Sequence, residues 1–365
     1  MSLTDPHLVF LLAGLSLFAV VLVVLLWRRM SGSKFRHIFG RITSLITINV
    51  LVIATIGAAL NNYGAFYGSW GELLGRQYSA PLMVDQSGDV ITAKDLENAT
   101  FTDNGTAIIY KLVRGESAGL TSRVIVALPP SYVSALKNGI KPRNDYRVVQ
   151  FFPGYPGHEI SWIKVMKVLD RMDEAMRAGK MTEIVAVFPH INIFPRFDAE
   201  CMNIPGGPQI ETWISRDIVN YINTWLNLTP RKWAAVGYSA GGWCASMLAI
   251  RHPDQYSLAA SIAGYYKPEI ATQITGESRK QLRSEYDLYG LIAAKPPAIS
   301  LFIVNPLADP FSNEATLNFL SQVKPPMEVT RVDLPGAGHN LRAWKQVLPS
   351  MLEWIDSGFK NKVNE

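Results

Sequence analysis

The sequence predicts an α/β domain with a mostly parallel sheet, preceded by a hairpin of two transmembrane helices. Three observations support this prediction. Two long apolar runs lie within the first 60 residues. After about residue 105, short β-branched runs alternate with segments of helical spacing, which is typical of a parallel sheet covered by helices on both faces. One of these strands leads directly through a Gly-rich turn into a helix, at residues 233–251.

The composition separates an apolar N-terminal part from an ordinary globular remainder. The 365 residues are 48% hydrophobic and 18% charged, and the apolar excess is concentrated near the N-terminus. The net charge is +5. Five basic residues of one short stretch account for a charge of that size: Arg28, Arg29, Lys34, Arg36 and Arg41. We therefore expect no nucleic-acid partner, because no basic face is evident elsewhere.

The two apolar runs have the length of membrane-spanning helices. Leu8–Trp27 contains no charged residue, and about 20 apolar residues suffice for a helix to cross a bilayer. Ile42–Leu60 is interrupted only by Asn49 and a few hydroxyl groups. The short basic loop between them is expected on the cytoplasmic side. We predict that residues 1–70 form a two-pass anchor in the cytoplasmic membrane, with helices at about 8–27 and 42–60, and that the following domain is extracytoplasmic.

A cleaved signal peptide is the alternative interpretation of these runs. The first run lacks preceding basic residues and is followed by Arg28-Arg29, which are the wrong flanks for a signal peptide. The second run has basic residues before it and Gly57-Ala58-Ala59 near its end, so cleavage there remains open. Both alternatives leave the C-terminal part outside the cytoplasm. The runs contain no carboxylate, so we expect no transporter or proton pathway.

The rest of the chain divides into a linker and one large domain. Residues 71–105 are polar and are expected to form a linker with a small β element, and residues 106–365 the α/β domain. No internal repeat is present. Strands are expected at Thr106–Val113, Ser122–Leu128, Arg147–Phe152, Glu183–Phe188, Trp233–Val236, Leu258–Ala263, Ile299–Val304 and Val329–Leu334. Helices are expected at Ser161–Met176, Glu211–Leu226, Ala240–Arg251, Asn313–Val323 and Leu341–Ile355.

The motif Gly237-Tyr238-Ser239-Ala240-Gly241 matches the Gly-x-Ser-x-Gly nucleophile elbow of α/β hydrolases. It lies between the strand Trp233–Val236 and the helix Ala240–Arg251, which is the setting that this motif requires. The tight turn needs small flanking residues, and the glycines supply them. A Gly-rich turn that merely happens to carry a serine is the alternative. The sequence favours Ser239 as a nucleophile on an α/β-hydrolase fold.

A serine hydroxyl is a weak nucleophile without a base, and in this fold the chain order is serine, acid, histidine. His339 follows a strand and the flexible stretch Pro335–Gly338, and it precedes an amphipathic helix. A loop of that kind can bring the imidazole to Ser239. His252 ends the elbow helix and is interpreted as a helix C-terminal charge. We predict His339 as the base, with a solvated loop histidine as the alternative.

The acid is expected after the strand that precedes the histidine, which is Ile299–Val304. Asp309 lies in the turn after that strand and is our first choice. Its alternative role is a turn or helix-cap aspartate before Pro310. Glu314 begins the next helix and is the second choice, since either carboxylate can hold the tautomer of the imidazole.

An oxyanion hole is expected from two backbone amides. One is the N–H of Ala240, the residue after the nucleophile, and the other belongs to a loop after an earlier strand. Phe152–His158 is that loop, and Gly154 allows the N–H of Tyr155 to point at the substrate oxygen. The motif calls for neither a metal nor an organic cofactor, and we expect neither.

The two cysteines of the chain are predicted to form a disulfide. A domain outside the cytoplasm is where such a bond persists. Cys244 lies five residues after Ser239 on the elbow helix, and Cys201 lies in the loop 192–209. That loop follows the strand Glu183–Phe188, which the expected strand order places beside the elbow strand. Two buried free thiols are the alternative.

The region from about Thr106 to Phe359 resembles the esterase D-like branch of the α/β hydrolases, which includes feruloyl esterases and secreted mycolyltransferases. The resemblance rests on VALPPSYV, FFPGYPGH, VGYSAGGWCASMLAIRHPDQYS and GAGHNLRAWKQVLPSMLEWI. It implies the same nucleophile, base and oxyanion amides. Mycolyltransferases use a glutamate as the acid, so Asp309 is closer to the esterase pattern. The two apolar helices, absent from secreted mycolyltransferases, resemble those of membrane-anchored envelope esterases of actinobacteria.

The expected function is a serine ester hydrolase or acyltransferase that acts through an acyl-enzyme. Its expected partners are the membrane and a lipid or glycolipid ester at the outer face of the cytoplasmic membrane. The alternatives are an aminoacyl-phospholipid hydrolase and a catalytically idle binding module with this fold. The sequence does not distinguish hydrolysis from acyl transfer, and it leaves open whether the segment Tyr265–Ala298 forms a cap over the site.

Overall fold

The computed structural model describes residues 3, 5–29, 32, 35–64, 70–74, 83–84, 90–193, 197–229 and 231–361. Its contacts divide the chain into two compact units, one with the N-terminal helices and one with the α/β domain. The linker predicted for residues 71–105 is described only in part, because residues 75–82 and 85–89 lie outside these ranges. Residues 30, 31, 33 and 34 of the predicted basic loop also lie outside them.

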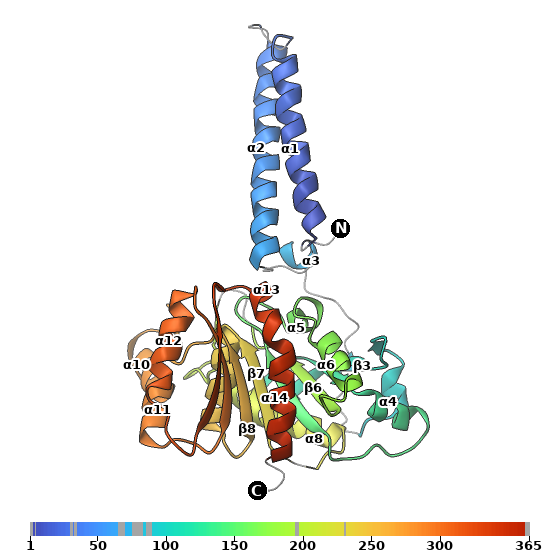
Figure 1. Cartoon of the computed structure of the whole chain (residues 1–365), viewed down its shortest axis with the longest axis vertical. Coiled ribbons are helices and arrows are strands. Elements are labelled where there is room, and N and C mark those ends of the chain that lie inside the picture. Colours follow the sequence, from blue (N-terminus) through green and yellow to red (C-terminus); the bar gives the residue numbers. More distant parts are fainter. Residues whose placement is uncertain are drawn as a thin grey trace. The chain divides into compact units, whose positions relative to one another are not determined.

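The N-terminal unit contains two long helices that lie side by side, α1 (Pro6–Leu26) and α2 (Phe35–Gly64) (Figure 1). Both are long and apolar enough to cross a membrane, with mean hydropathies of 3.1 and 2.1 over their most apolar windows. The Asp5 side chain caps α1 by accepting a hydrogen bond from the His7 N–H. Helix α2 begins at Phe35 rather than Ile42, because Arg36 and Arg41 are good helix formers and do not end a helix.

The α/β domain is built on one sheet with the strand order β1-β3-β4-β6-β5-β7-β8-β9-β10, and β2 pairs with β3. Neighbours from β6 to β10 are parallel, whereas β3, β4 and β6 pair antiparallel. The predicted fold class is thereby confirmed. The strands are β1 (Met83–Val84), β2 (Thr100–Phe101), β3 (Ala107–Gly115), β4 (Leu120–Leu128), β5 (Arg147–Phe152), β6 (Ile184–Pro189), β7 (Trp233–Tyr238), β8 (Tyr256–Ile262), β9 (Ser300–Pro306) and β10 (Glu328–Leu334).

The strand order reverses at β5, because β6 lies on one side of it and β7 on the other. In open α/β sheets, ligands bind beyond the carboxyl ends of the strands at such a switch point. The chain leaves β5 at Phe152 and β7 at Tyr238, so both predicted oxyanion amides lie at this position. Every residue of β7, β8 and β9 is buried, as expected for central strands covered on both faces.

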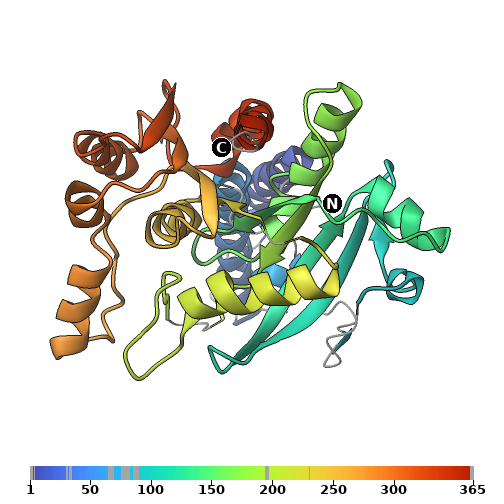
Figure 2. The ribbon, with the colours of Figure 1, turned by 90° about the horizontal axis from the view of Figure 1, so that it is seen from below.

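Helices cover the two faces of the sheet (Figure 2). On one face α6 (Val168–Arg177) contacts α14 (Leu348–Asn361). On the other lie α9 (Ala240–Arg251) and the continuous helical stretch α7, η2 and α8 (Ile210–Trp225), whose middle is a π-helical turn. The remaining elements are α3 (Trp70–Leu73), η1 (Ala93–Leu96), α4 (Pro130–Lys137), α5 (Ile160–Lys164), α10 (Gly276–Glu285), α11 (Leu288–Ala294), α12 (Pro310–Leu320), α13 (Leu341–Trp344) and η3 (Lys345–Val347).

Several predicted helices differ in their bounds. The single helix expected over Ser161–Met176 is two helices, because Lys167 adopts a left-handed conformation with φ of 60° between α5 and α6. The helix expected over Leu341–Ile355 is divided into α13, η3 and α14. The helices α4, α10 and α11 were not among those expected. Their sequences are short and interrupted by polar residues, so helical periodicity is weak there.

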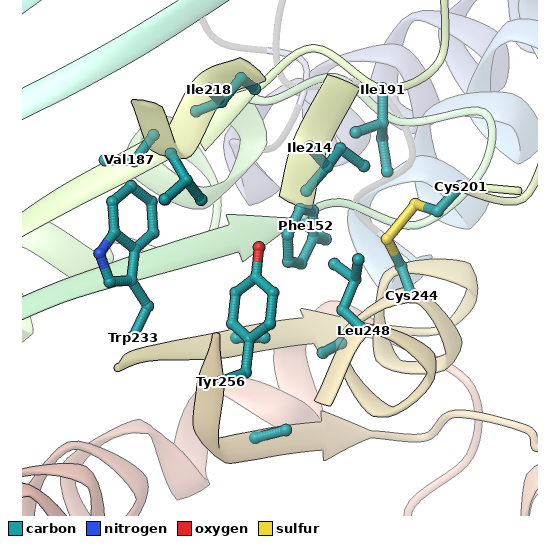
Figure 3. Packing of buried hydrophobic residues seen from close by; sticks show 14 of the residues in the cluster. Phe152, Val187, Ile191, Cys201, Ile214, Ile218, Trp233, Cys244, Leu248 and Tyr256 are labelled. Carbon is teal, nitrogen blue, oxygen red and sulfur yellow. A yellow bond between two sulfur atoms is a disulfide. The ribbon is translucent and has the colours of Figure 1, made fainter. Parts of the chain in front are cut away.

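The core beneath the switch point is dense and aromatic. Phe152, Leu248 and Tyr256 pack with Ile214 of the π-helical turn, and all four are fully buried (Figure 3). Beside them Cys201 and Cys244 form a disulfide, with Cα atoms 5.7 Å apart. The predicted disulfide is therefore confirmed, and it joins the loop after β6 to helix α9.

Candidate active site

Ser239 sits in a strained turn between β7 and α9. Its backbone has φ of 55° and ψ of −124°, a region that side-chain-bearing residues rarely adopt and that concentrates at functional sites. The flanking glycines are required by close packing. A Cβ on Gly237 would lie 1.9 Å from the Gly241 carbonyl oxygen, and one on Gly241 would lie 2.1 Å from that of Phe152. The turn therefore permits only glycine at both positions and presents the Ser239 side chain at the end of the sheet.

The structure brings His339 and Asp309 to Ser239. His339 Nε2 lies 2.8 Å from Ser239 Oγ, and His339 Nδ1 lies 2.5 Å from Asp309 Oδ2. A carboxylate only accepts hydrogen bonds, so the proton on Nδ1 points at Asp309 and Nε2 is left as an acceptor for the serine hydroxyl. This is the geometry that a general base next to a nucleophile requires.

The His339 imidazole contacts the carboxylate of Asp309, and no contact with Glu314 is present among the described residues. Asp309 precedes α12 and is 7% exposed, and its Oδ2 also accepts a hydrogen bond of 2.6 Å from Ser312. Glu314 lies in the following turn of α12 with its side chain exposed. Ser312 was not singled out in the sequence, although a serine three residues after a helix-capping aspartate is a recognisable local pattern.

The loops that carry the acid and the histidine are tied together. The Ala308 N–H donates to the Ala337 carbonyl at 2.9 Å, and the Leu307 N–H donates to the Leu334 carbonyl at 3.1 Å. The imidazole of His339 rests edge-on against the buried Trp344 ring, with centroids 4.7 Å apart. The flexibility predicted for the Gly-rich stretch before His339 is therefore restrained at both ends.

The loop after β5 approaches Ser239 closely. A Cβ on Gly154 would lie 3.1 Å from the Ser239 Cβ, so the absence of a side chain at Gly154 allows the approach. The next residue is Tyr155, and within the described part of the chain its N–H donates to no protein acceptor. Ala240 is the first residue of α9, so its N–H has no acceptor inside the helix. Both amides are available for a ligand oxygen.

Asn192 supports this loop from the neighbouring strand, and the sequence did not single it out. Its side-chain amide donates to the Gly154 carbonyl at 2.9 Å and to the Gly157 carbonyl at 2.5 Å. Asn192 lies just after β6, the sheet neighbour of β5. The sequence shows that Asn192 follows a predicted strand, but it does not show which carbonyl groups accept hydrogen bonds from its side chain.

A buried ionic group lies behind the same loop. Glu159 Oε1 pairs with Arg123 at 2.9 Å, and Glu159 Oε2 lies 2.7 Å from His190 Nδ1. Burial alone raises the pKa of the Glu159 carboxyl, but the hydrogen bond from His190 and the charge of Arg123 outweigh it and lower that pKa. With His158, these groups bring three metal-type ligand atoms within 4.8 Å of one another. Because Arg123 already pairs with Glu159 and His190 occupies its other oxygen, the arrangement is better suited to fixing the loop than to holding a cation.

The chain belongs to the esterase family whose model is described as "Putative esterase", because that model matches residues 116–355, more than half of the chain. This region contains Ser239, Asp309 and His339. It agrees with the esterase D-like resemblance noted in the sequence.

Solved structures share the fold, and a curated relative is similar over a short segment. A ferulic acid esterase superposes with a TM-score of 0.58 at 18% identity, over 70% of this chain and 98% of the other. An S-formylglutathione hydrolase from Agrobacterium tumefaciens superposes with a TM-score of 0.57 at 14% identity, over 71% of this chain and 97% of the other. The MPT51 antigen of Mycobacterium leprae is 38% identical over 63 residues, which are 17% of this chain. The match spans about a fifth of that relative's length (21%).

Proposed function

We propose that this member of the esterase family is a membrane-anchored serine ester hydrolase or acyltransferase that works through an acyl-enzyme. The observation that carries the proposal is the hydrogen-bonded series from Ser239 Oγ through the His339 imidazole to Asp309. A strained serine at a helix N-terminus, an oriented imidazole and a buried carboxylate together form the arrangement used for acyl transfer.

The proposed reaction has two halves. His339 Nε2 takes the proton of Ser239 as Oγ attacks the ester carbonyl, and the resulting oxyanion receives hydrogen bonds from the Tyr155 and Ala240 amides. The protonated His339 then gives the proton to the leaving alcohol. In the second half, His339 removes a proton from water or from another hydroxyl group, which attacks the acyl-enzyme. Asp309 holds the tautomer and stabilises the imidazolium in both halves.

We place the substrate among lipid or glycolipid esters at the outer face of the cytoplasmic membrane. The two apolar helices support an anchor in that membrane. The disulfide supports a domain outside the cytoplasm. Three apolar side chains next to the candidate site are exposed, Tyr155, Leu307 and Phe311, at 38%, 40% and 50%. An exposed apolar rim suits a substrate that is itself apolar.

The location has a direct test. Protease added to intact spheroplasts should digest the α/β domain and leave the segment between Arg28 and Arg41 protected. A C-terminal reporter that is active only in the cytoplasm should give no signal. A signal from that reporter would show that the C-terminus is cytoplasmic, and it would contradict the proposed extracytoplasmic location.

The competing interpretation is a binding module that keeps the fold without catalysis. Labelling of the detergent-solubilised full-length chain with a fluorophosphonate probe separates the two, because the probe reacts only with an activated serine. We expect labelling of the wild type and of the exposed-serine control Ser284→Ala, and none of Ser239→Ala. Absence of labelling in the folded wild type would favour the binding module.

A further inference from the structure

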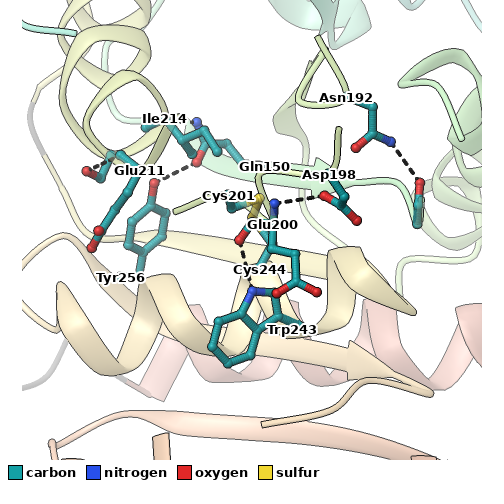
Figure 4. Close-up of a disulfide and its surroundings, with 12 residues drawn as sticks. Gln150, Asn192, Asp198, Glu200, Cys201, Glu211, Ile214, Trp243, Cys244 and Tyr256 are labelled. Atoms are coloured by element: carbon teal, nitrogen blue, oxygen red, sulfur yellow. Dashed lines mark hydrogen bonds between the residues drawn. A yellow bond between two sulfur atoms is a disulfide. The ribbon is translucent and has the colours of Figure 1, made fainter. Parts of the chain in front are cut away.

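Three carboxyl groups, those of Asp198, Glu200 and Glu269, gather beside the candidate site. Glu200 is 4% exposed and directly precedes the disulfide residue Cys201. Asp198 is partly buried, and its Oδ1 accepts a hydrogen bond of 2.7 Å from the Glu200 N–H (Figure 4). Glu269 is exposed and lies close enough for its charge to act on Glu200. Among the described residues, no basic side chain forms an ion pair with any of the three.

One oxygen of the buried carboxyl is unused. Glu200 Oε1 accepts a hydrogen bond of 2.6 Å from the Tyr265 hydroxyl. Glu200 Oε2 is inaccessible to solvent and accepts no hydrogen bond within the described part of the chain. The Glu269 amide faces the carboxyl, but its geometry falls short of a hydrogen bond. Buried polar atoms are almost always paired, so an orphaned carboxylate oxygen points to a missing donor.

The electrostatics agree with a missing positive charge. Burial is the main cause that raises the pKa of the Glu200 carboxyl, and the charges of Asp198 and Glu269 act in the same direction. The Tyr265 hydroxyl opposes them, and the net pKa is about 8. Burial also raises the pKa of Asp198. A cation within about 4–6 Å would reverse these effects by favouring the charged carboxylates.

The cluster lies against the residues that follow the nucleophile and the acid. The Tyr265 ring stacks on Trp243, four residues after Ser239, with centroids 5.8 Å apart. It also contacts Phe311, two residues after Asp309, at 5.5 Å. The Trp243 indole N–H donates to the Glu200 carbonyl at 2.9 Å (Figure 4). Tyr265 and Trp243 therefore link the carboxyl cluster to the two segments that carry Ser239 and Asp309.

The chemistry of the cluster selects the kind of cation. Within the described residues, the three carboxyls do not converge closely enough to share one metal ion. An ammonium group carries three N–H donors and binds carboxylates that are farther apart. We propose that Asp198, Glu200 and Glu269 form a subsite for a positively charged amino group of the ester substrate. This inference rests on the proposed esterase function and narrows its substrate class to amine-bearing esters.

The test compares charged and neutral esters on the full-length protein in detergent. The acyl side is probed by alanine p-nitrophenyl ester against p-nitrophenyl propanoate. The alcohol side is probed by acetylthiocholine against its uncharged carbon isostere, 3,3-dimethylbutyl thioacetate. In at least one pair, we expect the charged ester to have a kcat/KM about tenfold or more higher, as charged hydrogen bonds support. The pair that shows this preference identifies which side of the ester carries the amine.

Glu200→Gln and Asp198→Asn should each reduce the preference to near unity while leaving kcat/KM for the neutral ester within about twofold. The neutral ester thus reports that the variants remain folded and active. Glu277→Gln, which removes an exposed carboxylate of α10 outside the cluster, is the matched control and should keep the preference. Equal kcat/KM for charged and neutral esters in both pairs, or a preference that survives in Glu200→Gln and Asp198→Asn, would overturn the subsite. The proposed esterase function would be contradicted by a different result, namely that the wild-type protein does not hydrolyse the neutral esters.

Discussion

His339 and Asp309 meet through a 2.5 Å hydrogen bond although 30 residues and the whole of α12 and β10 separate them. The contact exists because β9 and β10 are parallel neighbours, so the loops at their carboxyl ends leave the sheet side by side. The same arrangement brings both to Ser239, which follows β7, two strands away. The three groups therefore depend on the sheet and not on sequence proximity.

Asp309→Asn should damage activity far more than Glu314→Gln. An asparagine at this position holds the imidazole in the wrong tautomer, which costs about 10⁴-fold in kcat in a serine triad. Glu314 is exposed on α12, so its amide should leave kcat within about twofold. Hydrolysis of a short p-nitrophenyl ester by the two purified variants measures this. If Glu314→Gln were the more damaging change, the acid would have to be reassigned.

Asn192→Ala should lower kcat about 10-fold to 100-fold with little change in KM. The side chain fixes the Gly154 and Gly157 carbonyls, and the loop it holds carries the Tyr155 amide. Loss of an oxyanion donor itself costs about 10²–10³-fold, and a misplaced donor should cost less. Asn138→Ala, at an exposed helix end, is the control and should behave as wild type. An unchanged kcat in folded Asn192→Ala would show that Asn192 does not position the loop that carries the Tyr155 amide.

The acid stability of the domain should depend on Glu211. Burial opposes its ionisation, but hydrogen bonds from His252 and Arg251 lower its pKa to about 2, against 4.5 for a free glutamate. Since the folded pKa is the lower one, the stabilisation is fully present above pH 4.5 and is lost as the pH falls toward 2. Denaturant unfolding should show a steep loss of stability over that window. Glu211→Gln should have a lower free energy of unfolding at pH 7, and that free energy should fall less steeply between pH 4.5 and 2. An equally steep fall in the variant would show that another group causes the acid sensitivity.

Much of the fold followed from the sequence because apolar periodicity and turn chemistry act locally. The bounds of β5 and α9 agree with the expected Arg147–Phe152 and Ala240–Arg251, where a buried strand or helix ends at a Pro or Gly. The helix break at Lys167 and the π-helical turn at Trp213–Ile218 were not predicted. Both lie in segments with buried side chains on either side of the irregularity, and apolar periodicity alone does not mark them.

The candidate site shows the same division. Ser239, His339 and Asp309 lie in motifs and turns that identify them. Asn192 and Glu200 instead contact segments that are distant in the sequence, and Ser312 donates a local hydrogen bond to Asp309. Their residue types are common in loops, so no sequence pattern separates them from solvated neighbours. Only the three-dimensional contacts show which of them meet the site.

The central claim is that Ser239 carries the acyl group during turnover, and peptide mass spectrometry tests it most directly. The full-length protein is quenched in acid within the first turnovers of a p-nitrophenyl ester, digested, and searched for the mass of the acyl group. We predict an acyl adduct on the peptide containing Ser239 in the wild type, and an accumulated adduct with no turnover when His339→Ala is acylated by an activated ester. Ser239→Ala should show neither adduct nor hydrolysis, with a loss of about 10³-fold or more. Hydrolysis at the wild-type rate by Ser239→Ala, or an adduct on another residue, would contradict the account.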